Sequence, residues 1–330
     1  MGVIEQLLAY GWWVGAICIV IGFVALVKGA DWLVDGASAI AKRFGISDLV
    51  IGLTVVAFGT SMPEFVVNMF SVAEGSTDLA ITNILGSNII NTYVILGLTA
   101  LVYPVVSQKR SREFYIPISI LAGVMVLAAI FNPFHEGPRE IGRVGGICLL
   151  VVFACFLYQT FRHLKTAPDA QQPSTAKPIA TWPAIGLVLA GLAGLVIGGE
   201  LIVKSAVDIA TRMGVSEAVI GLTIVALGTS LPELATSVIA ASKKNSDIAL
   251  GNVIGSNIFN VFFVLATSAT IHPLPAYEGL ELDAVMVVLG SVLVWLFVKT
   301  DREKEVKRWA GAVLLLLYAA YLTYRLIEIH

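Results

Sequence analysis

Apolar segments long enough to cross a lipid bilayer recur along the whole of this 330-residue chain. A transmembrane helix needs about 20 consecutive, mostly apolar residues. Ten segments of about that length occur, at 10–34, 46–71, 78–102, 114–131, 141–161, 183–206, 215–241, 247–271, 280–298 and 307–326. They are continuous runs without the alternation of a membrane β-barrel. The sequence therefore predicts an all-α integral membrane protein with ten transmembrane helices.

The composition excludes several other classes of protein. The chain is 57% hydrophobic and 13% charged, whereas soluble domains average about 25% charged residues. So few charges cannot cover a soluble domain of this size, which excludes a soluble globular enzyme and a disordered chain. The net charge of −2 provides no basic surface for phosphates. We therefore expect the lipid bilayer, and no nucleic acid, as a partner.

The chain is divided into two similar halves. Residues 163–181 are polar, aperiodic and rich in Pro, Ser and Gln, as flexible linkers are. They separate 1–162 from 182–330, and each half has five predicted helices. GLTVVAFGTSMPE at 52–64 matches GLTIVALGTSLPE at 221–233, identical at ten of thirteen positions, and GSNIIN at 86–91 matches GSNIFN at 255–260 with the same offset of 169 residues.

An odd number of helices in each repeat inverts the second repeat relative to the first. Inverted repeats are typical of secondary transporters, whose site lies at the repeat interface near the middle of the bilayer. With the N-terminus outside, the predicted inner loops carry 16 of the 21 Lys and Arg residues. The positive-inside rule then places the linker in the cytoplasm and both termini on the non-cytoplasmic side of the plasma (inner) membrane.

Glu64 and Glu233 lie inside predicted helices at equivalent positions of the two repeats. A carboxylate at this depth costs roughly 2.5–3.5 kcal/mol on insertion scales, so a matched pair indicates a function. Asp31 and Glu200 also correspond across the repeats. They lie near the ends of the predicted spans, where we expect interfacial water to solvate them.

A Thr-Ser-x-Pro sequence precedes each of the two glutamates. Proline has no N–H and clashes with the carbonyl four residues back, so we expect broken helices with freed carbonyls. Each repeat then offers a carboxylate, two hydroxyls and backbone oxygens within one or two turns. The residues concerned are Ala57, Gly59, Thr60 and Ser61 in the first repeat, and Ala226, Gly228, Thr229 and Ser230 in the second.

Further oxygen-bearing side chains follow in the next helix of each repeat. Ser87 and Asn91 are four residues apart and share a helix face, as do Ser256 and Asn260. With neither imidazole nor thiolate, this set suits hard cations such as Ca²⁺ or Na⁺. Two carboxylates match the charge of one Ca²⁺. The neighbouring asparagines at 88 and 257 fit helix packing as well as they fit ion binding.

At these motifs the sequence resembles the sodium/calcium exchangers of the cation/calcium exchanger superfamily, in their bacterial or archaeal form. GTSMPE at 59–64, GTSLPE at 228–233 and the two GSN motifs carry the resemblance, which extends over all ten predicted helices. It implies alternating access in two inverted five-helix repeats, with one Ca²⁺ exchanged for several Na⁺ at four clustered sites. It implies no cofactor and no obligate protein partner.

The resemblance also implies a role for each motif residue. Glu64 and Glu233 would be the central acidic ligands, and oxygens of Thr60 and Thr229 would complete the Ca²⁺ site. Asn91 and Asn260 match the middle site, where some relatives carry an aspartate; here both are uncharged. The two flanking Na⁺ sites would be formed by Ala57, Ser61 and Ser87, and by Ala226, Ser230 and Ser256.

Functions of other kinds fit the sequence less well. An intramembrane hydrolase needs catalytic groups at depth, but the four histidines lie in predicted loops or at the chain end, and neither HExxH nor GxSxG occurs. A channel usually needs a symmetric ring of subunits. A proton/calcium exchanger is the main alternative, because the two glutamates could carry protons. The additional hydroxyl and amide oxygens favour Na⁺, and we therefore predict a non-enzymatic, electrogenic antiporter that extrudes Ca²⁺.

Overall fold

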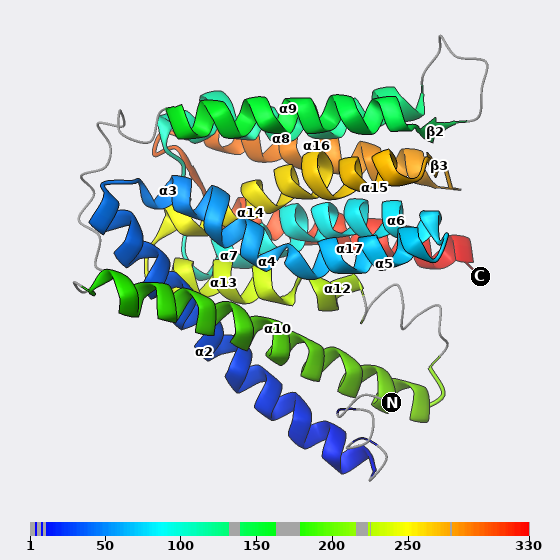
Figure 1. Ribbon diagram of the computed structural model, residues 1–330, viewed down its shortest axis with the longest axis horizontal. Coiled ribbons are helices and arrows are strands. Elements are labelled where there is room, and N and C mark those ends of the chain that lie inside the picture. The colour runs from blue at the N-terminus through cyan, green and yellow to red at the C-terminus, as the bar shows by residue number, and fades with distance from the viewer. Residues whose placement is uncertain are drawn as a thin grey trace.

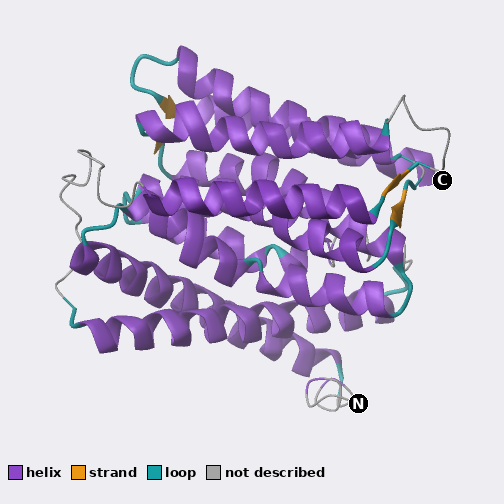
Figure 2. Cartoon of the chain, turned by 45° about the horizontal axis from the view of Figure 1, so that its top comes forward, coloured by secondary structure: helices purple, strands orange, loops and turns teal. Residues whose placement is uncertain are grey.

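The computed structural model confirms the all-α class. It describes residues 11–131, 139–162, 179–215, 226–277 and 279–329, together with Ile4, Leu8 and Ile224. Within these ranges the chain forms a layered bundle of helices, with two short strand pairs at its ends (Figures 1 and 2). Most of the predicted linker, at 163–178, and most of 216–225 lie outside the described residues.

In the first repeat, most predicted spans form from more than one helical segment. The helices are α2 (Trp12–Phe44), α3 (Asp48–Ile51), α4 (Ala57–Thr60), α5 (Met62–Ala73), α6 (Thr77–Ile89), α7 (Leu96–Val102), α8 (Ile116–Ile130) and α9 (Arg143–Arg162). π-Helical stretches at Gly52–Val56 and Ile90–Ile95 join α3 to α4 and α6 to α7, and a third at Ser111–Tyr115 precedes α8.

The second repeat has a corresponding order of elements. The helices are α10 (Thr181–Arg212), α12 (Ala226–Thr229), α13 (Leu231–Ser242), α14 (Ser246–Phe259), α15 (Ala266–Ile271), α16 (Leu280–Thr300) and α17 (Arg308–Ile329). A π-helical stretch at Asn260–Leu265 joins α14 to α15, as Ile90–Ile95 joins α6 to α7. Such wide turns inside α-helices occur frequently at functional sites.

The described residues contain eight helices that are long and apolar enough to cross a membrane, or nine when the bent pair Asp48–Thr60 and Met62–Ala73 counts as one span. The remaining predicted span, 215–241, begins in residues that the structure does not describe. The segments Thr77–Val102 and Ser246–Ile271 are the most enclosed of these spans. They form the centre of the bundle, and the other spans cover them.

Helices α2 and α10 are much longer than the predicted spans 10–34 and 183–206, at 33 and 32 residues. At 1.5 Å per residue each is about 50 Å long. Asp31 and Glu200 therefore lie within these helices and not at their ends, and their side chains are partly exposed, at 38% and 49%. The prediction ended each span near its first carboxylate, but Asp31 forms an ion pair with Lys243 at 2.7 Å and Glu200 one with Lys204 at 2.7 Å.

The two long helices pack against each other in antiparallel fashion through glycines (Figure 1). A Cβ atom at Gly22 would lie 2.8 Å from the carbonyl oxygen of Gly198, and one at Gly29 would lie 2.8 Å from that of Gly191. Any side chain there would push the backbones apart. The two contacts are equivalent under the 169-residue offset, so the same pair of small residues from each repeat forms the crossing.

Two antiparallel strand pairs connect the repeats at opposite ends of the bundle (Figure 2). Strand β1 (Val105–Val106) pairs with β4 (Glu305–Val306), and β2 (Glu140–Ile141) pairs with β3 (Leu274–Pro275). Because each pair joins a loop of the first repeat to a loop of the second, both ends of the bundle are tied across the repeat boundary.

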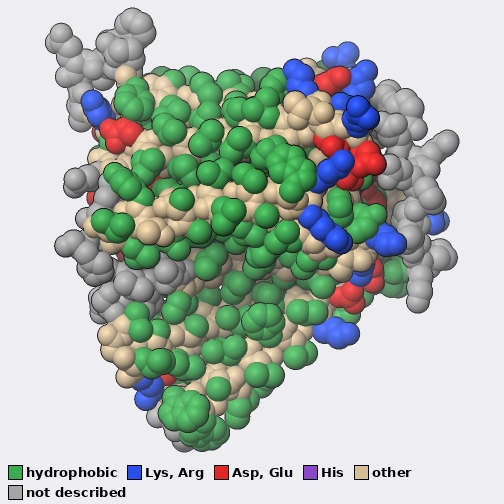
Figure 3. Space-filling model, turned by 180° about the vertical axis from the view of Figure 1, so that it is seen from behind, with side chains coloured by type: hydrophobic (Ala, Val, Ile, Leu, Met, Phe, Trp, Pro, Cys, Tyr) green, Lys and Arg blue, Asp and Glu red, His purple; other side chains and the backbone are tan. Residues whose placement is uncertain are grey.

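The two ends of the bundle differ in charge, and basic side chains gather at one edge (right in Figure 3). The β1–β4 pair and the hydrogen bond from Asn245 to Asp48 (2.7 Å) place several loops at this end. Lys28 and Lys204, assigned to loops by the prediction, lie within α2 and α10. The remaining described basic residues divide between the two ends. This end carries Lys42, Arg43, Lys109, Arg110, Arg112, Arg162, Lys243, Lys244, Lys299, Arg302, Lys304, Lys307 and Arg308. The opposite end carries Arg139, Arg143, Arg212 and Arg325.

Candidate cation-binding site

The predicted break in the first repeat is present. Helices α4 and α5 meet at Ser61 with a bend of 44° between Asp48–Thr60 and Met62–Ala73. Pro63 stands in the first turn of α5, where its missing N–H is tolerated. In the second repeat, Ser230 separates α12 from α13 in the same way, with Pro232 in the first turn. Each glutamate therefore lies in the first turn of a new helix.

One detail of the predicted break was wrong. The main-chain carbonyl of Ala57 is not freed by the proline, because it accepts hydrogen bonds from the amide of Ser61 (3.0 Å) and from the hydroxyl of Thr60 (3.3 Å). The chain bends after this turn has closed. The side chain of Ala226, the equivalent residue, lies outside the described part of the chain, although its backbone begins α12.

The two glutamates are buried and are held reciprocally by serines of the opposite repeat. Glu64 is 1% exposed and Glu233 is 0% exposed. The hydroxyl of Ser61 donates to Oε1 of Glu233 at 3.0 Å, and the hydroxyl of Ser230 donates to Oε1 of Glu64 at 3.5 Å. Because these bonds cross the repeat boundary, both carboxylates lie at a single interface.

Several polar atoms at this interface have no hydrogen-bond partner within the described structure. They include the Oε2 atoms of both glutamates, the hydroxyls of Ser87 and Thr229, and both polar atoms of the Asn91 side chain. Oδ1 of Asn260 is a further one. Leaving buried carboxylate and hydroxyl oxygens unpaired is unfavourable, and a cation of suitable size would satisfy them together.

The asparagines of the GSN motifs tie the two repeats to each other. Nδ2 of Asn88 donates to the main-chain carbonyl of Asn257 at 3.2 Å, and Nδ2 of Asn260 donates to Oδ1 of Asn88 at 3.1 Å. Nδ2 of Asn257 donates to the hydroxyl of Thr92 at 2.8 Å. Asn88 and Asn257 thus have a structural role between helices. In contrast, neither polar atom of the Asn91 side chain has a hydrogen-bond partner among the described residues.

The remaining predicted residues lie in the same region. Ser256 donates to Oε1 of Glu233 at 3.5 Å, whereas its counterpart Ser87 has no partner among the described residues. The hydroxyl of Thr60 lies 3.1 Å from Oδ1 of Asn252, a residue that our sequence reasoning missed. Asn252 and its counterpart Asn83 stand four residues before the serines of the GSN motifs, at the common offset of 169. Extending the motif comparison by three residues would have identified them.

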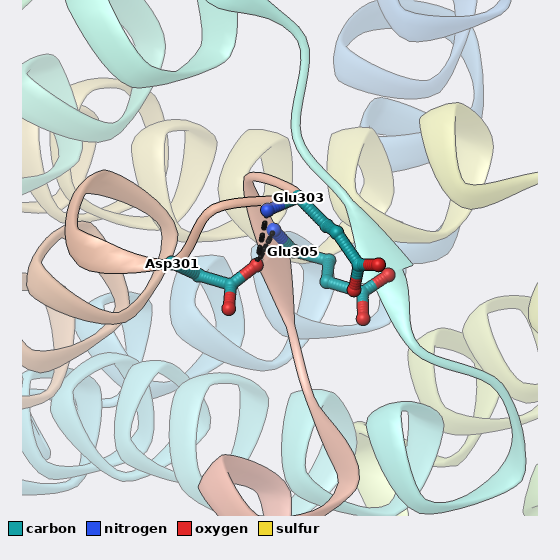
Figure 4. A group of neighbouring side chains, drawn as sticks. All are labelled: Asp301, Glu303 and Glu305. Carbon is teal, nitrogen blue, oxygen red and sulfur yellow. Dashed lines mark hydrogen bonds between the residues drawn. The ribbon is translucent and has the colours of Figure 1, made fainter.

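The described residues also include an acidic group far from the glutamate pair, formed by Asp301, Glu303 and Glu305 between α16 and α17 (Figure 4). Oδ2 of Asp301 accepts hydrogen bonds from the amides of Glu303 (2.9 Å) and Glu305 (3.4 Å), and Lys307 lies 2.9 Å from Oδ1. The Lys307 ammonium holds the pKa of Asp301 below its usual value. These contacts give Asp301 a structural role, because its carboxylate closes the turn between α16 and β4.

Two buried carboxylates surrounded by hydroxyl and amide oxygens, within a bundle of membrane-spanning helices, define a membrane transporter for hard cations. A family model described as "Sodium/calcium exchanger protein" matches residues 14–162 and 183–327. The chain belongs to this family of transporters, whose substrates are Na⁺ and Ca²⁺, and so to the cation/calcium exchanger superfamily.

Related proteins match over nearly the whole chain. The putative antiporter CaxA of Alkalimonas amylolytica is 37% identical over 318 residues, covering 93% of this chain and 97% of CaxA. The sodium/calcium exchanger MaX1 of Methanosarcina acetivorans is 35% identical over 351 residues, covering 94% and 97%. A solved structure of the sodium-calcium exchanger NCX_Mj superimposes with a TM-score of 0.81 at 32% identity, covering 94% of this chain and 98% of NCX_Mj.

Proposed function

We propose that this protein exchanges Ca²⁺ for Na⁺ across the plasma (inner) membrane by alternating access. The observation that carries the proposal is the pair of buried glutamates, each hydrogen-bonded by a serine of the opposite repeat. Their second carboxylate oxygens have no partner among the described residues. Two negative charges at one repeat interface balance one Ca²⁺, and removing that ion leaves charges that several monovalent cations must neutralise.

The proposed ligands are the twelve residues of the two repeats. Glu64 and Glu233 bind both ions, and oxygens of Thr60 and Thr229 complete the Ca²⁺ site. Asn91 and Asn260 form an uncharged middle position. The flanking Na⁺ positions consist of Ala57, Ser61 and Ser87 on one side and Ala226, Ser230 and Ser256 on the other. The burial of the described members and the unpaired oxygens among them support this set.

We also propose ten transmembrane helices in two inverted repeats, 1–162 and 182–330, joined by a cytoplasmic linker at 163–181. The antiparallel crossing of α2 and α10 and the reciprocal serine–glutamate bonds support the inversion. The excess of Lys and Arg at one end supports an inward orientation of that end and non-cytoplasmic termini.

Labelling of single cysteines tests the orientation. In a background without the native cysteines, Ser174→Cys in the linker should resist a membrane-impermeant reagent applied to intact cells. Ser76→Cys, in the exposed turn between α5 and α6, is the matched control and should react readily. The opposite pattern would reverse the orientation.

Ca²⁺ uptake into proteoliposomes tests the transport function. Vesicles loaded with Na⁺ should accumulate Ca²⁺, whereas vesicles loaded with Li⁺ or K⁺ should not. A pH gradient imposed without Na⁺ distinguishes Na⁺ coupling from proton coupling. Ca²⁺ uptake driven by protons alone would identify a proton/calcium exchanger and refute the Na⁺-coupled function.

A further inference from the structure

Asn252 connects three elements around the glutamate pair, although it belongs to none of the predicted ligand positions. It lies on α14, one helical turn before Ser256, and is fully buried. Its Nδ2 donates to the main-chain carbonyl of Glu233 (3.2 Å) and to the hydroxyl of Ser237 (2.9 Å). Its Oδ1 accepts from the hydroxyl of Thr60 (3.1 Å). One amide thereby ties α4 of the first repeat to α13 and α14 of the second.

The orientation of the amide follows from these partners. A main-chain carbonyl can only accept, so the side-chain atom that faces Glu233 is the NH₂ group. The atom that faces Thr60 is then the amide oxygen, which can only accept. The hydroxyl of Thr60 carries one proton, and its polar neighbours are Oδ1 of Asn252, the carbonyl of Ala57 and the Glu233 carboxylate, all of which are acceptors. That proton is therefore committed to the protein.

A committed proton makes the Thr60 hydroxyl a better cation ligand. A cation is bound by the oxygen lone pairs and repels the hydroxyl proton, so a free hydroxyl has to be reoriented on binding. An acceptor that already holds the proton removes that requirement, which is the general advantage of preorganisation.

The first repeat does not provide the same arrangement for Thr229. Asn83, the counterpart of Asn252, donates to Oδ1 of Asn68 at 2.8 Å and is only half-buried. The hydroxyl of Thr229 has no amide acceptor of this kind; the Glu64 carboxylate is its neighbour, and no hydrogen bond of good geometry forms there among the described residues. Two threonines with identical motif positions are thus held differently.

We propose that Asn252 is a positioning residue that presets Thr60 as a Ca²⁺ ligand. This inference rests on the proposed function, because it assigns the ion that Thr60 receives. It makes the Ca²⁺ affinity depend more strongly on Asn252 than on Asn83, and more strongly on Thr60 than on Thr229.

Equilibrium binding of ⁴⁵Ca²⁺ to the purified protein in Na⁺-free buffer tests the proposal. Asn252→Ala should weaken Ca²⁺ binding about tenfold, the effect expected for losing one buried hydrogen bond. Thr60→Val should weaken binding by a similar factor, and the double variant should be no weaker than Thr60→Val, because both changes remove one function. Asn83→Ala is the matched control and should change binding less than about twofold.

Other results would contradict the proposal. Multiplying losses in the double variant would show that Asn252 acts independently of Thr60, and equal losses for Asn83→Ala and Asn252→Ala would remove the asymmetry. If Asn252→Ala does not yield a monodisperse protein, the Ca²⁺ binding of Thr60→Val is compared with that of Thr229→Val. Equal losses of binding in these two variants would overturn the inference. A wild-type protein that binds no ⁴⁵Ca²⁺ would refute the proposed function as well, whereas wild-type binding with unchanged variants would refute this inference alone.

Discussion

The two repeats bring the same residues to the site, yet they hold their glutamates differently. Glu233 receives two hydroxyls on Oε1, from Ser61 at 3.0 Å and Ser256 at 3.5 Å. Glu64 receives Ser230 at 3.5 Å, and Ser87 has no partner in the described structure. Identical motifs therefore specify the kind of site, while the packing around each motif specifies how firmly each ligand is held.

The two broken helices also differ in how they contact the long helices. The atoms nearest to a Cβ placed on Gly59 belong to Leu192, and those nearest to one on Gly228 belong to Val203. Both are residues of α10. Under the 169-residue offset, the counterpart of Val203 is Val34 on α2. No atom of Val34 is among the three nearest to a Cβ placed on Gly59. The two broken helices thus meet the α2–α10 pair in different registers.

Loss of either carboxylate is the largest expected effect and tests whether the repeats remain equivalent in charge. Glu64→Gln and Glu233→Gln should each reduce Na⁺-driven Ca²⁺ uptake to background, because a single carboxylate cannot balance the charge of a buried Ca²⁺. Uptake is measured in proteoliposomes with equal amounts of monodisperse protein. Substantial transport by either variant would show that one repeat alone suffices.

The effect of membrane potential tests how many charges each exchange cycle moves, given that both repeats place an uncharged residue at the middle position. If three Na⁺ replace one Ca²⁺, the two carboxylates and the neutral Asn91 and Asn260 leave one net positive charge, which responds to voltage by about 2.3 kcal/mol per 100 mV. An inside-positive potential, set with valinomycin and K⁺, should accelerate Ca²⁺ uptake into Na⁺-loaded vesicles. An inside-negative potential would then favour Ca²⁺ extrusion in the cell. Ca²⁺ uptake that does not depend on the membrane potential would indicate two Na⁺ per Ca²⁺.

Removal of the serine hydroxyls tests whether the two glutamates are held with different strength. Ser61→Ala should weaken Ca²⁺ binding about tenfold and Ser230→Ala about threefold, because a hydrogen bond to a carboxylate contributes up to a few kcal/mol and weakens with distance. Equilibrium binding of ⁴⁵Ca²⁺ gives both factors. If Ser230→Ala proves the more damaging change, the two half-sites are held in the opposite order.

An ion pair present in one repeat alone provides the smallest expected effect. Lys243 contacts Asp31 at 2.7 Å and Asp35 at 2.6 Å, linking the end of α13 to α2. Its counterpart in the first repeat is Glu74, an exposed residue. Lys243→Ala should lower the thermal stability of the detergent-solubilised protein slightly, since partly exposed pairs contribute about 0–1 kcal/mol. Glu74→Ala should leave it unchanged, and equal shifts would show that the pair adds nothing.

The sequence alone determined the class of this protein and most of its candidate site. Long apolar runs admit few alternatives to membrane helices, because backbone polar groups must be satisfied internally in lipid. A duplicated Thr-Ser-x-Pro-Glu motif identifies buried carboxylates without knowledge of their surroundings. The same reasoning ended α2 and α10 too early, since hydropathy registers Asp31 and Glu200 as polar but not the partners that hold them within a helix.

The tertiary structure alone decided which atoms of the two repeats meet. The Ser61–Glu233 and Thr60–Asn252 bonds join residues 172 and 192 positions apart, and no local pattern encodes such a distance. The difference between Thr60 and Thr229 is likewise invisible in the motif, because both read Gly-Thr-Ser. A hydrogen bond depends on placement to within a few tenths of an ångström, and that placement is set by how whole helices pack.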